Sequence, residues 1–155
     1  MFLLYINDIH RTSSILSYIL FADDTSTLLS AKDLNTLITI INKELISLSM
    51  WFRGNKLSVN VAKTNYILFT NHKTQIQHPD LILDQQPVKQ VCSTKFLGIE
   101  LDSKLTWKNH IRILESKIAS SLFLLRKIRH KLNQITAFML YDAIILPHLM
   151  YCNVI

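Results

Sequence analysis

The stretch Phe21-Ala22-Asp23-Asp24 lies between two short apolar runs, Tyr18-Ile19-Leu20 and Thr27-Leu28-Leu29. This pattern predicts two short strands, with both aspartates at or near the turn that joins them. Two ionised carboxylates roughly 5 Å apart repel by about 3 kcal/mol at an effective dielectric of about 20. A hard cation such as Mg²⁺ would remove that repulsion, because it binds one or two carboxylates together with substrate phosphates. Aspartate is also common in ordinary turns. The four residues alone therefore favour a metal site and plain turn chemistry equally.

Composition and cysteine usage bound the class of protein. The 155 residues are 49% hydrophobic, which is enough for one buried core and too apolar for disorder. The longest apolar stretch, residues 137–151, is interrupted by Asp142, Pro147 and His148 and is too short to span a bilayer, so we expect no membrane partner. Cys92 and Cys152 fit no disulfide or zinc pattern. They are expected to be reduced, partly buried thiols of an intracellular protein, nuclear or cytoplasmic.

Positive charge is concentrated in the C-terminal part of the chain. Residues 91–155 contain nine Lys and Arg against four Asp and Glu, whereas residues 1–90 contain eight against seven. The excess peaks between Arg126 and Lys131. Such a cluster is found at solvated helix ends and on surfaces that contact phosphates, and by itself it favours the solvated helix end.

Hydrophobic spacing predicts an α+β fold in which helices cover one face of an antiparallel sheet. Ser30 and Asp33 resemble a capping box before a helix that Gly54-Asn55 ends. The apolar positions of this helix repeat at helical spacing: Leu34, Leu37, Ile38, Ile41, Leu45, Leu48 and then Trp51-Phe52.

Later segments alternate between strands and helices. Strands are expected at residues 65–70, 81–83, 88–91 and 96–101, with Gly98 inside the last of these, at a bulge or a close backbone approach. The chain is expected to be helical from Trp107 onward, with a second helix that ends before Pro147.

Five segments, in this order, resemble the C-terminal portion of a reverse transcriptase of the non-LTR (LINE-type) retrotransposon class. Residues 2–9 resemble the segment after the Pro-Gln-Gly motif, and residues 21–25 the catalytic palm hairpin. The next palm motif is matched by Trp51, Asn55, Leu57, Asn60, Lys63-Thr64 and Leu68-Phe69. Phe96-Leu97-Gly98 with Leu105-Thr106-Trp107 resembles the primer-gripping hairpin, and Leu125-Arg126-Lys127 with residues 141–151 resembles the thumb.

The resemblance implies a partial palm at residues 1–92, a primer-grip hairpin at 93–106 and a helical thumb at 107–155. It implies nucleotidyl transfer with two Mg²⁺ (or Mn²⁺) ions, an RNA template, a DNA primer and deoxynucleoside triphosphates. Asp23 and Asp24 would be metal ligands, and Lys63 the general acid for pyrophosphate. Phe96, Leu97 and Gly98 would hold the primer. The nucleic-acid backbone would lie against Arg126, Lys127, Arg129 and Lys131.

One part of the family pattern has no counterpart in residues 1–155. A further metal-binding aspartate, the Pro-Gln-Gly segment and the fingers would all precede Met1. We therefore expect a fragment that carries half of a metal site and has no polymerase activity alone. The alternatives are a non-catalytic nucleic-acid-binding remnant and a small domain in which Asp23-Asp24 is turn chemistry.

Overall fold

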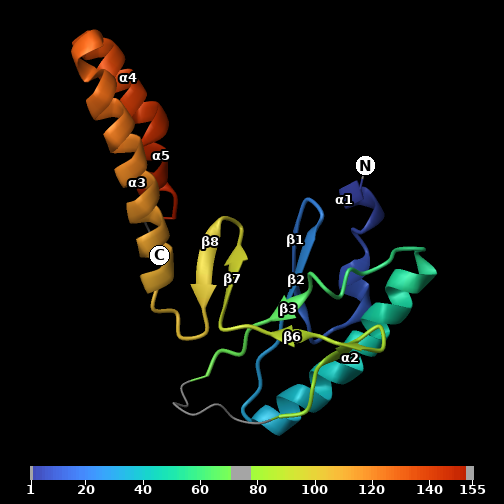
Figure 1. Cartoon of the computed structure of the whole chain (residues 1–155). Coiled ribbons are helices and arrows are strands. Elements are labelled where there is room, and N and C mark those ends of the chain that lie inside the picture. Colours follow the sequence, from blue (N-terminus) through green and yellow to red (C-terminus); the bar gives the residue numbers. More distant parts are fainter. Residues whose placement is uncertain (1, 71–77, 153–155) are drawn as a thin grey trace. The chain divides into compact units, whose positions relative to one another are not determined.

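The structure, a computed structural model, describes residues 2–70 and 78–152 and mixes helices with strands, which confirms the α+β class (Figure 1). The chain divides into two compact units, Met1–Cys92 (unit 1) and Ser93–Ile155 (unit 2). Unit 1 comprises α1 (Phe2–Tyr5), the 3₁₀ helix η1 (Ile9–Thr12), β1 (Ser17–Phe21), β2 (Asp24–Leu28), α2 (Leu34–Gly54), β3 (Asn65–Tyr66), β4 (Ile82–Leu83), β5 (Gln86–Pro87) and β6 (Lys89–Gln90). Unit 2 comprises β7 (Ser93–Phe96), β8 (Ile99–Asp102), α3 (Lys108–Ile128), the 3₁₀ helix η2 (Arg129–Lys131), α4 (Gln134–Ile144) and α5 (Leu146–Met150).

Helix α2 organises the core of unit 1, as its apolar periodicity predicts. Ile38, Leu45 and Leu48 are buried on one face of the helix, and Trp51 and Phe52 pack beside them. Around this face gather side chains from four other segments. The buried cluster consists of Ile9, Ile38, Leu45, Leu48, Val61, Leu81, Leu83 and Val88.

The ends of α2 follow from its capping groups. Asp33 is the N-cap, and its carboxylate accepts a hydrogen bond of 2.9 Å from the Thr36 backbone N–H. The predicted Ser30 cap is wrong, because Asp33 stands next to the first helical residue, where a side-chain acceptor can reach the free N–H groups. The hydrogen bonds from Thr36 lower the pKa of Asp33. The predicted stop is confirmed, because α2 ends at Gly54.

The expected single antiparallel sheet is wrong. The described residues form four separate two-stranded pairs: β1 with β2, β4 with β5 and β7 with β8 are antiparallel, and β3 with β6 is parallel. One reason is that α2 occupies the edge of β4. The Asn42 side chain accepts from the Ile82 N–H at 2.9 Å and donates to the Asp80 carbonyl at 3.2 Å, so these groups need no further strand.

Unit 2 is a hairpin followed by long helices (Figure 1). Gly98 lies in the turn between β7 and β8, so its predicted place inside a strand is wrong. Leu97 and Gly98 have φ angles of 46° and 90°, and a two-residue turn with two positive φ angles matches the right-handed twist of a hairpin. The expected end of the helix before Pro147 is close to the structure. α4 stops at Ile144, and Pro147 lies in the first turn of α5, where no N–H is needed.

Unit 2 buries few of its apolar side chains. Among its described residues, Ile99 and Ile145 are the buried hydrophobics, whereas Ile135 is 73% exposed on α4. Cys92 and Cys152 are free thiols as predicted, but they are exposed and not partly buried. Within the described part of the chain, no helix combines the length and apolarity that crossing a membrane would require.

Candidate functional site

The β1–β2 hairpin presents the two adjacent carboxylates, as the sequence predicts. The strands pair from Ser17 with Leu28 to Phe21 with Asp24, which leaves Ala22 and Asp23 as the turn. Asp23 and Asp24 are both exposed. The end of the hairpin therefore carries two adjacent, exposed carboxylates, one in the turn and one at the start of β2.

Ala22 has a φ of 52°, in the left-handed region that glycine adopts most easily. For an L-residue this conformation costs roughly 1 kcal/mol. Such outliers cluster at ligand and catalytic sites, where the surrounding structure holds them in place. The strain lies directly before Asp23 and is a second reason, besides the carboxylate pair, to regard this turn as a site.

The two carboxylates of the hairpin end suit a hard cation whose remaining ligands are waters and substrate phosphates. Among the described residues, no cluster of three or more His, Cys, Asp and Glu side chains could hold a metal ion. Two carboxylates nevertheless match the way Mg²⁺ is held in phosphate-processing sites, through one or two carboxylates, waters and substrate phosphates. Asp23 and Asp24 thus fit as a contribution to such a site.

Lys63 belongs to a tight turn before β3. Its backbone N–H donates to the Asn60 carbonyl at 3.1 Å and is 3.2 Å from the Asn60 side-chain oxygen. The ammonium side chain is exposed. Within residues 2–70 and 78–152, no ion pair joins Lys63 to Asp23 or Asp24. The ammonium is therefore accessible to a ligand.

An apolar cavity of about 150 Å³ lies between β2, α2 and β3 in unit 1. Tyr66 is on its wall, and burial raises the pKa of the Tyr66 phenol, with a further contribution from the charge of Asp80. The cavity walls contain none of the predicted site residues. It is a feature of the core of unit 1 and separate from the carboxylate turn.

The predicted primer-contacting residues form the end of the β7–β8 hairpin. Phe96 and Ile99 close the ladder, and Leu97 and Gly98 make the turn. Phe96 and Leu97 are half-buried, whereas Gly98 is exposed. Leu97 at φ 46° is a second strained residue at a predicted site, since a β-hairpin turn of this kind favours Asn or Asp there.

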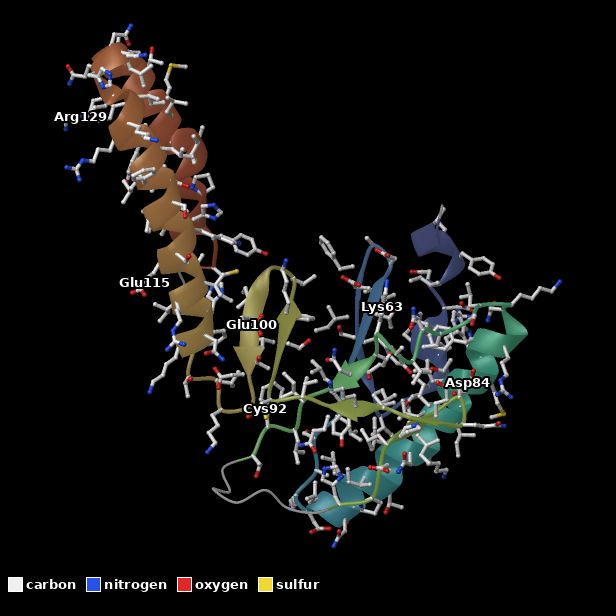
Figure 2. The ribbon with its side chains drawn as sticks, in the orientation of Figure 1. Lys63, Asp84, Cys92, Glu100, Glu115 and Arg129 are labelled. Carbon is white, nitrogen blue, oxygen red and sulfur yellow. The ribbon has the colours of Figure 1, made fainter. Side chains whose placement is uncertain are left out.

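The predicted backbone-contacting residues cluster at the far end of α3. Arg126 and Lys127 are in its last turn, and Arg129 and Lys131 are in η2. All four side chains are exposed, and Figure 2 shows Arg129 at the tip of the helical arm. The Lys127 ammonium lies 5.2 Å from the centre of the Phe123 ring. A dense positive patch therefore faces solvent at this end.

Two further basic residues of α3 were missed in the sequence. Lys108 and Arg112 are four residues apart, and with Arg126 they fall within about 40° on an ideal helix. The spacing of four was visible in the sequence and could have identified them. Glu115, seven residues after Lys108, lies on the same side of an ideal helix and interrupts the positive stripe. Tyr151, which contacts the β7–β8 turn, was also not singled out.

The site residues are divided between the two units. Asp23, Asp24 and Lys63 belong to unit 1. The hairpin residues and the basic residues belong to unit 2. Each group of residues therefore lies within its own unit.

Comparison with known proteins supports the resemblance that the motifs indicate. No family model and no solved structure matches the chain. The chain is 30% identical over 107 residues, 66% of its length, to a probable RNA-directed DNA polymerase from transposon X-element of Drosophila melanogaster. It is 27% identical over 135 residues, 84% of its length, to the RNA-directed DNA polymerase from mobile element jockey of the same organism. The matches span 12% and 14% of those proteins. The chain is thus similar to segments of RNA-directed DNA polymerases from two mobile elements.

Proposed function

We propose that this chain is a segment of a non-LTR retrotransposon reverse transcriptase, an RNA-directed DNA polymerase. Residues 1–92 would form part of the palm, residues 93–106 the primer-grip hairpin and residues 107–155 the thumb. The observation that carries the proposal is the strained β1–β2 turn with exposed Asp23 and Asp24. Similarity to two RNA-directed DNA polymerases supports it.

Asp23 and Asp24 are the residues that would hold Mg²⁺ or Mn²⁺. When bound, the ion would activate the primer 3′-hydroxyl and stabilise charge on the departing pyrophosphate. Because Asp23 lies in the turn and Asp24 is the first residue of β2, the two carboxylates would not bind in the same way. Asp23 would be the principal ligand and Asp24 the weaker one. The exposed Lys63 ammonium would donate a proton to pyrophosphate oxygen.

Unit 2 would hold the template–primer duplex without reading its sequence. The turn at Leu97-Gly98 would contact the primer, and the basic end of α3 would contact phosphates. Figure 1 shows α4 and α5 alongside α3, returning from that end towards the hairpin. From Gln134 to Met150 these helices cover roughly 25 Å at about 1.5 Å per residue. The two contacts would then be about seven base pairs apart at roughly 3.4 Å per step.

Metal binding by the turn can be tested with Mn²⁺. Paramagnetic broadening should be strongest for the amide signals of residues 22–25. Asp23→Asn should weaken Mn²⁺ binding at least about tenfold, because even changes outside the ligand shell cost that much. Asp80→Asn removes the same charge from an exposed position elsewhere in unit 1 and serves as the control. Equal broadening in Asp23→Asn and the unchanged protein would contradict the assignment.

Duplex binding tests unit 2 separately. Affinity for an RNA–DNA duplex should fall steeply with salt, by about 0.9 in the logarithmic slope for each phosphate contacted. The double variant Arg126→Ala/Arg129→Ala should lower that slope by about two. Lys32→Ala/Lys43→Ala removes equal charge from unit 1 and should leave the slope nearly unchanged. A flat salt response in the unchanged chain would contradict nucleic-acid binding.

The second candidate is a non-catalytic nucleic-acid-binding module. It is favoured by the position of the basic excess in the sequence, because this excess belongs to unit 2, whereas the carboxylate turn belongs to unit 1. Primer extension on an RNA template with Mg²⁺ should give no product with residues 1–155 alone under either candidate. Duplex binding together with Mn²⁺ binding at Asp23 supports the polymerase segment, whereas duplex binding alone supports the module. Asp23-dependent extension would contradict the expectation of half a metal site.

A further inference from the structure

Tyr151, the first residue after α5, contacts the β7–β8 turn. Its hydroxyl donates a hydrogen bond of 2.5 Å to the backbone carbonyl of Leu97, 54 positions earlier in the sequence. Both residues belong to unit 2. The contact joins the first residue after α5 to the first central residue of the turn.

The ring of Tyr151 also packs against the turn. A Cβ atom placed on Gly98 would lie 3.4 Å from Cε1 of Tyr151, 3.7 Å from its hydroxyl oxygen and 3.8 Å from Cζ. A side chain at this position would therefore meet the aromatic ring. Such a Cβ would make ordinary van der Waals contact with the ring, so glycine at position 98 is required by the positive φ of the turn and not by Tyr151.

The turn contains a strained residue that contacts from outside the hairpin can stabilise. Leu97 has a φ of 46°, which costs an L-residue roughly 1 kcal/mol. Strained residues persist where neighbouring contacts hold them. A charge-neutral hydroxyl-to-carbonyl hydrogen bond and an aromatic contact at the adjacent residue supply such contacts here.

We propose that Tyr151 is a positioning residue that fastens the β7–β8 turn to the end of α5. It would fix the distance between the turn and the basic end of α3, so that both engage one duplex at a set spacing. This role rests on the proposed function of unit 2. Tyr151 itself contacts the turn and not the reacting atoms.

Hydrogen exchange tests the fastening without any nucleic acid. Tyr151→Phe keeps the ring and removes the hydroxyl. Loss of one hydrogen bond should raise amide exchange in residues 93–102 by roughly two- to tenfold. Tyr18→Phe makes the same change in unit 1, where the Tyr18 hydroxyl lies 2.6 Å from the Thr12 hydroxyl, and should leave residues 93–102 unchanged. Unchanged exchange in Tyr151→Phe would overturn the proposal.

Duplex affinity tests the positioning role. The unchanged chain should bind duplexes longer than about seven base pairs more tightly than shorter ones, and Tyr151→Phe should lose at least about threefold on the longer duplexes only. If Tyr151→Phe exchanges faster but binds long duplexes equally well, the positioning role is overturned and the proposed function stands. If the unchanged chain binds no duplex, the proposed function and the positioning role both fail, while exchange still reports on the fastening.

Discussion

The backbone N–H of Trp107 lies 3.0 Å from Oδ2 of Asp102 and donates a hydrogen bond to it. The same carboxylate accepts hydrogen bonds from the backbone of Lys104 at 3.0 Å and of Thr106 at 2.9 Å. Leu105 and Trp107, in this loop, have positive φ angles of 51° and 61°. One carboxylate therefore holds the loop that leads from β8 into α3.

Acid should weaken unit 2 through Asp102. Desolvation raises the pKa of this carboxyl, but the hydrogen bonds from Thr106, Lys104 and Trp107 together lower it below its ordinary value of 3.8. A lowered folded-state pKa contributes stability above pH 3.8, and this is lost as pH falls through the folded pKa. Asp102→Asn should melt lower at neutral pH and lose less on acidification, as measured by thermal unfolding from pH 7 to pH 2. Parallel pH curves for the two proteins would contradict this role.

The conformation of Ala22 predicts a stabilising glycine. Ala22→Gly relieves roughly 1 kcal/mol of left-handed strain, offset by about 0.5 kcal/mol from the greater freedom of the unfolded chain, a net gain of about 0.5 kcal/mol. Ala119→Gly, in the exposed middle of α3, should instead lose about 1 kcal/mol. Urea unfolding of both variants measures the two signs. A destabilised Ala22→Gly would show that the turn carries no such strain.

Two isoleucines of α2 should differ strongly in their contribution. Ile38 is 4% exposed within the core cluster, whereas Ile46 on the same helix is 60% exposed. Ile38→Ala should cost about 2–5 kcal/mol through lost burial and a cavity. Ile46→Ala should change the free energy of unfolding by less than about 0.5 kcal/mol. Equal losses at both positions would mean that Ile46 is covered by something else.

Removing Glu115 should strengthen duplex binding. It lies on the side of α3 that carries Lys108, Arg112 and Arg126, where it would repel the phosphates of a bound duplex. Glu115→Gln should tighten duplex binding several-fold at low salt and lose the gain as salt screens the charges. Glu44→Gln on α2, a helix of the same length in unit 1, is the control. Weaker binding by Glu115→Gln would place the duplex on another side of α3.

Leu97→Asn should separate stability from binding. Asparagine suits the positive φ of this turn, so the hairpin should gain about 1 kcal/mol. The leucine side chain that would touch the primer is lost at the same time, so duplex affinity should fall. Thermal unfolding and fluorescence anisotropy measure the two effects. A variant that is both more stable and equally tight in binding would leave Leu97 without a functional reason.

Structural features that depend on residues close together in the sequence were predictable. The period of α2 and its end at Gly54 follow from residues within a few turns of one another, and so does the turn at Ala22-Asp23. Gly98 was misplaced because the apolar Leu97 makes residues 96–101 resemble one uninterrupted strand, whereas the chain accepts a strained leucine in the turn.

Long-range pairings had no local signal. The parallel pairing of Asn65 with Lys89 joins segments that are separated by a long connection, and two-residue strands leave no pattern of alternation to read. The contact of Tyr151 with Leu97 is likewise set by where α4 and α5 return, and helix packing decides that return. At the candidate site, the sequence indicated which residue types matter. It did not predict the positive φ angles of Ala22 and Leu97, because both residues usually adopt negative φ angles.

The strained Leu97 has a consequence for the history of the gene. Replacement of this leucine by asparagine should improve folding, so mutation has an easy route away from it in any copy whose hairpin no longer serves a purpose. A leucine retained at this position across related copies would mark lineages under selection, and its drift to asparagine or glycine would mark copies that have been released from it.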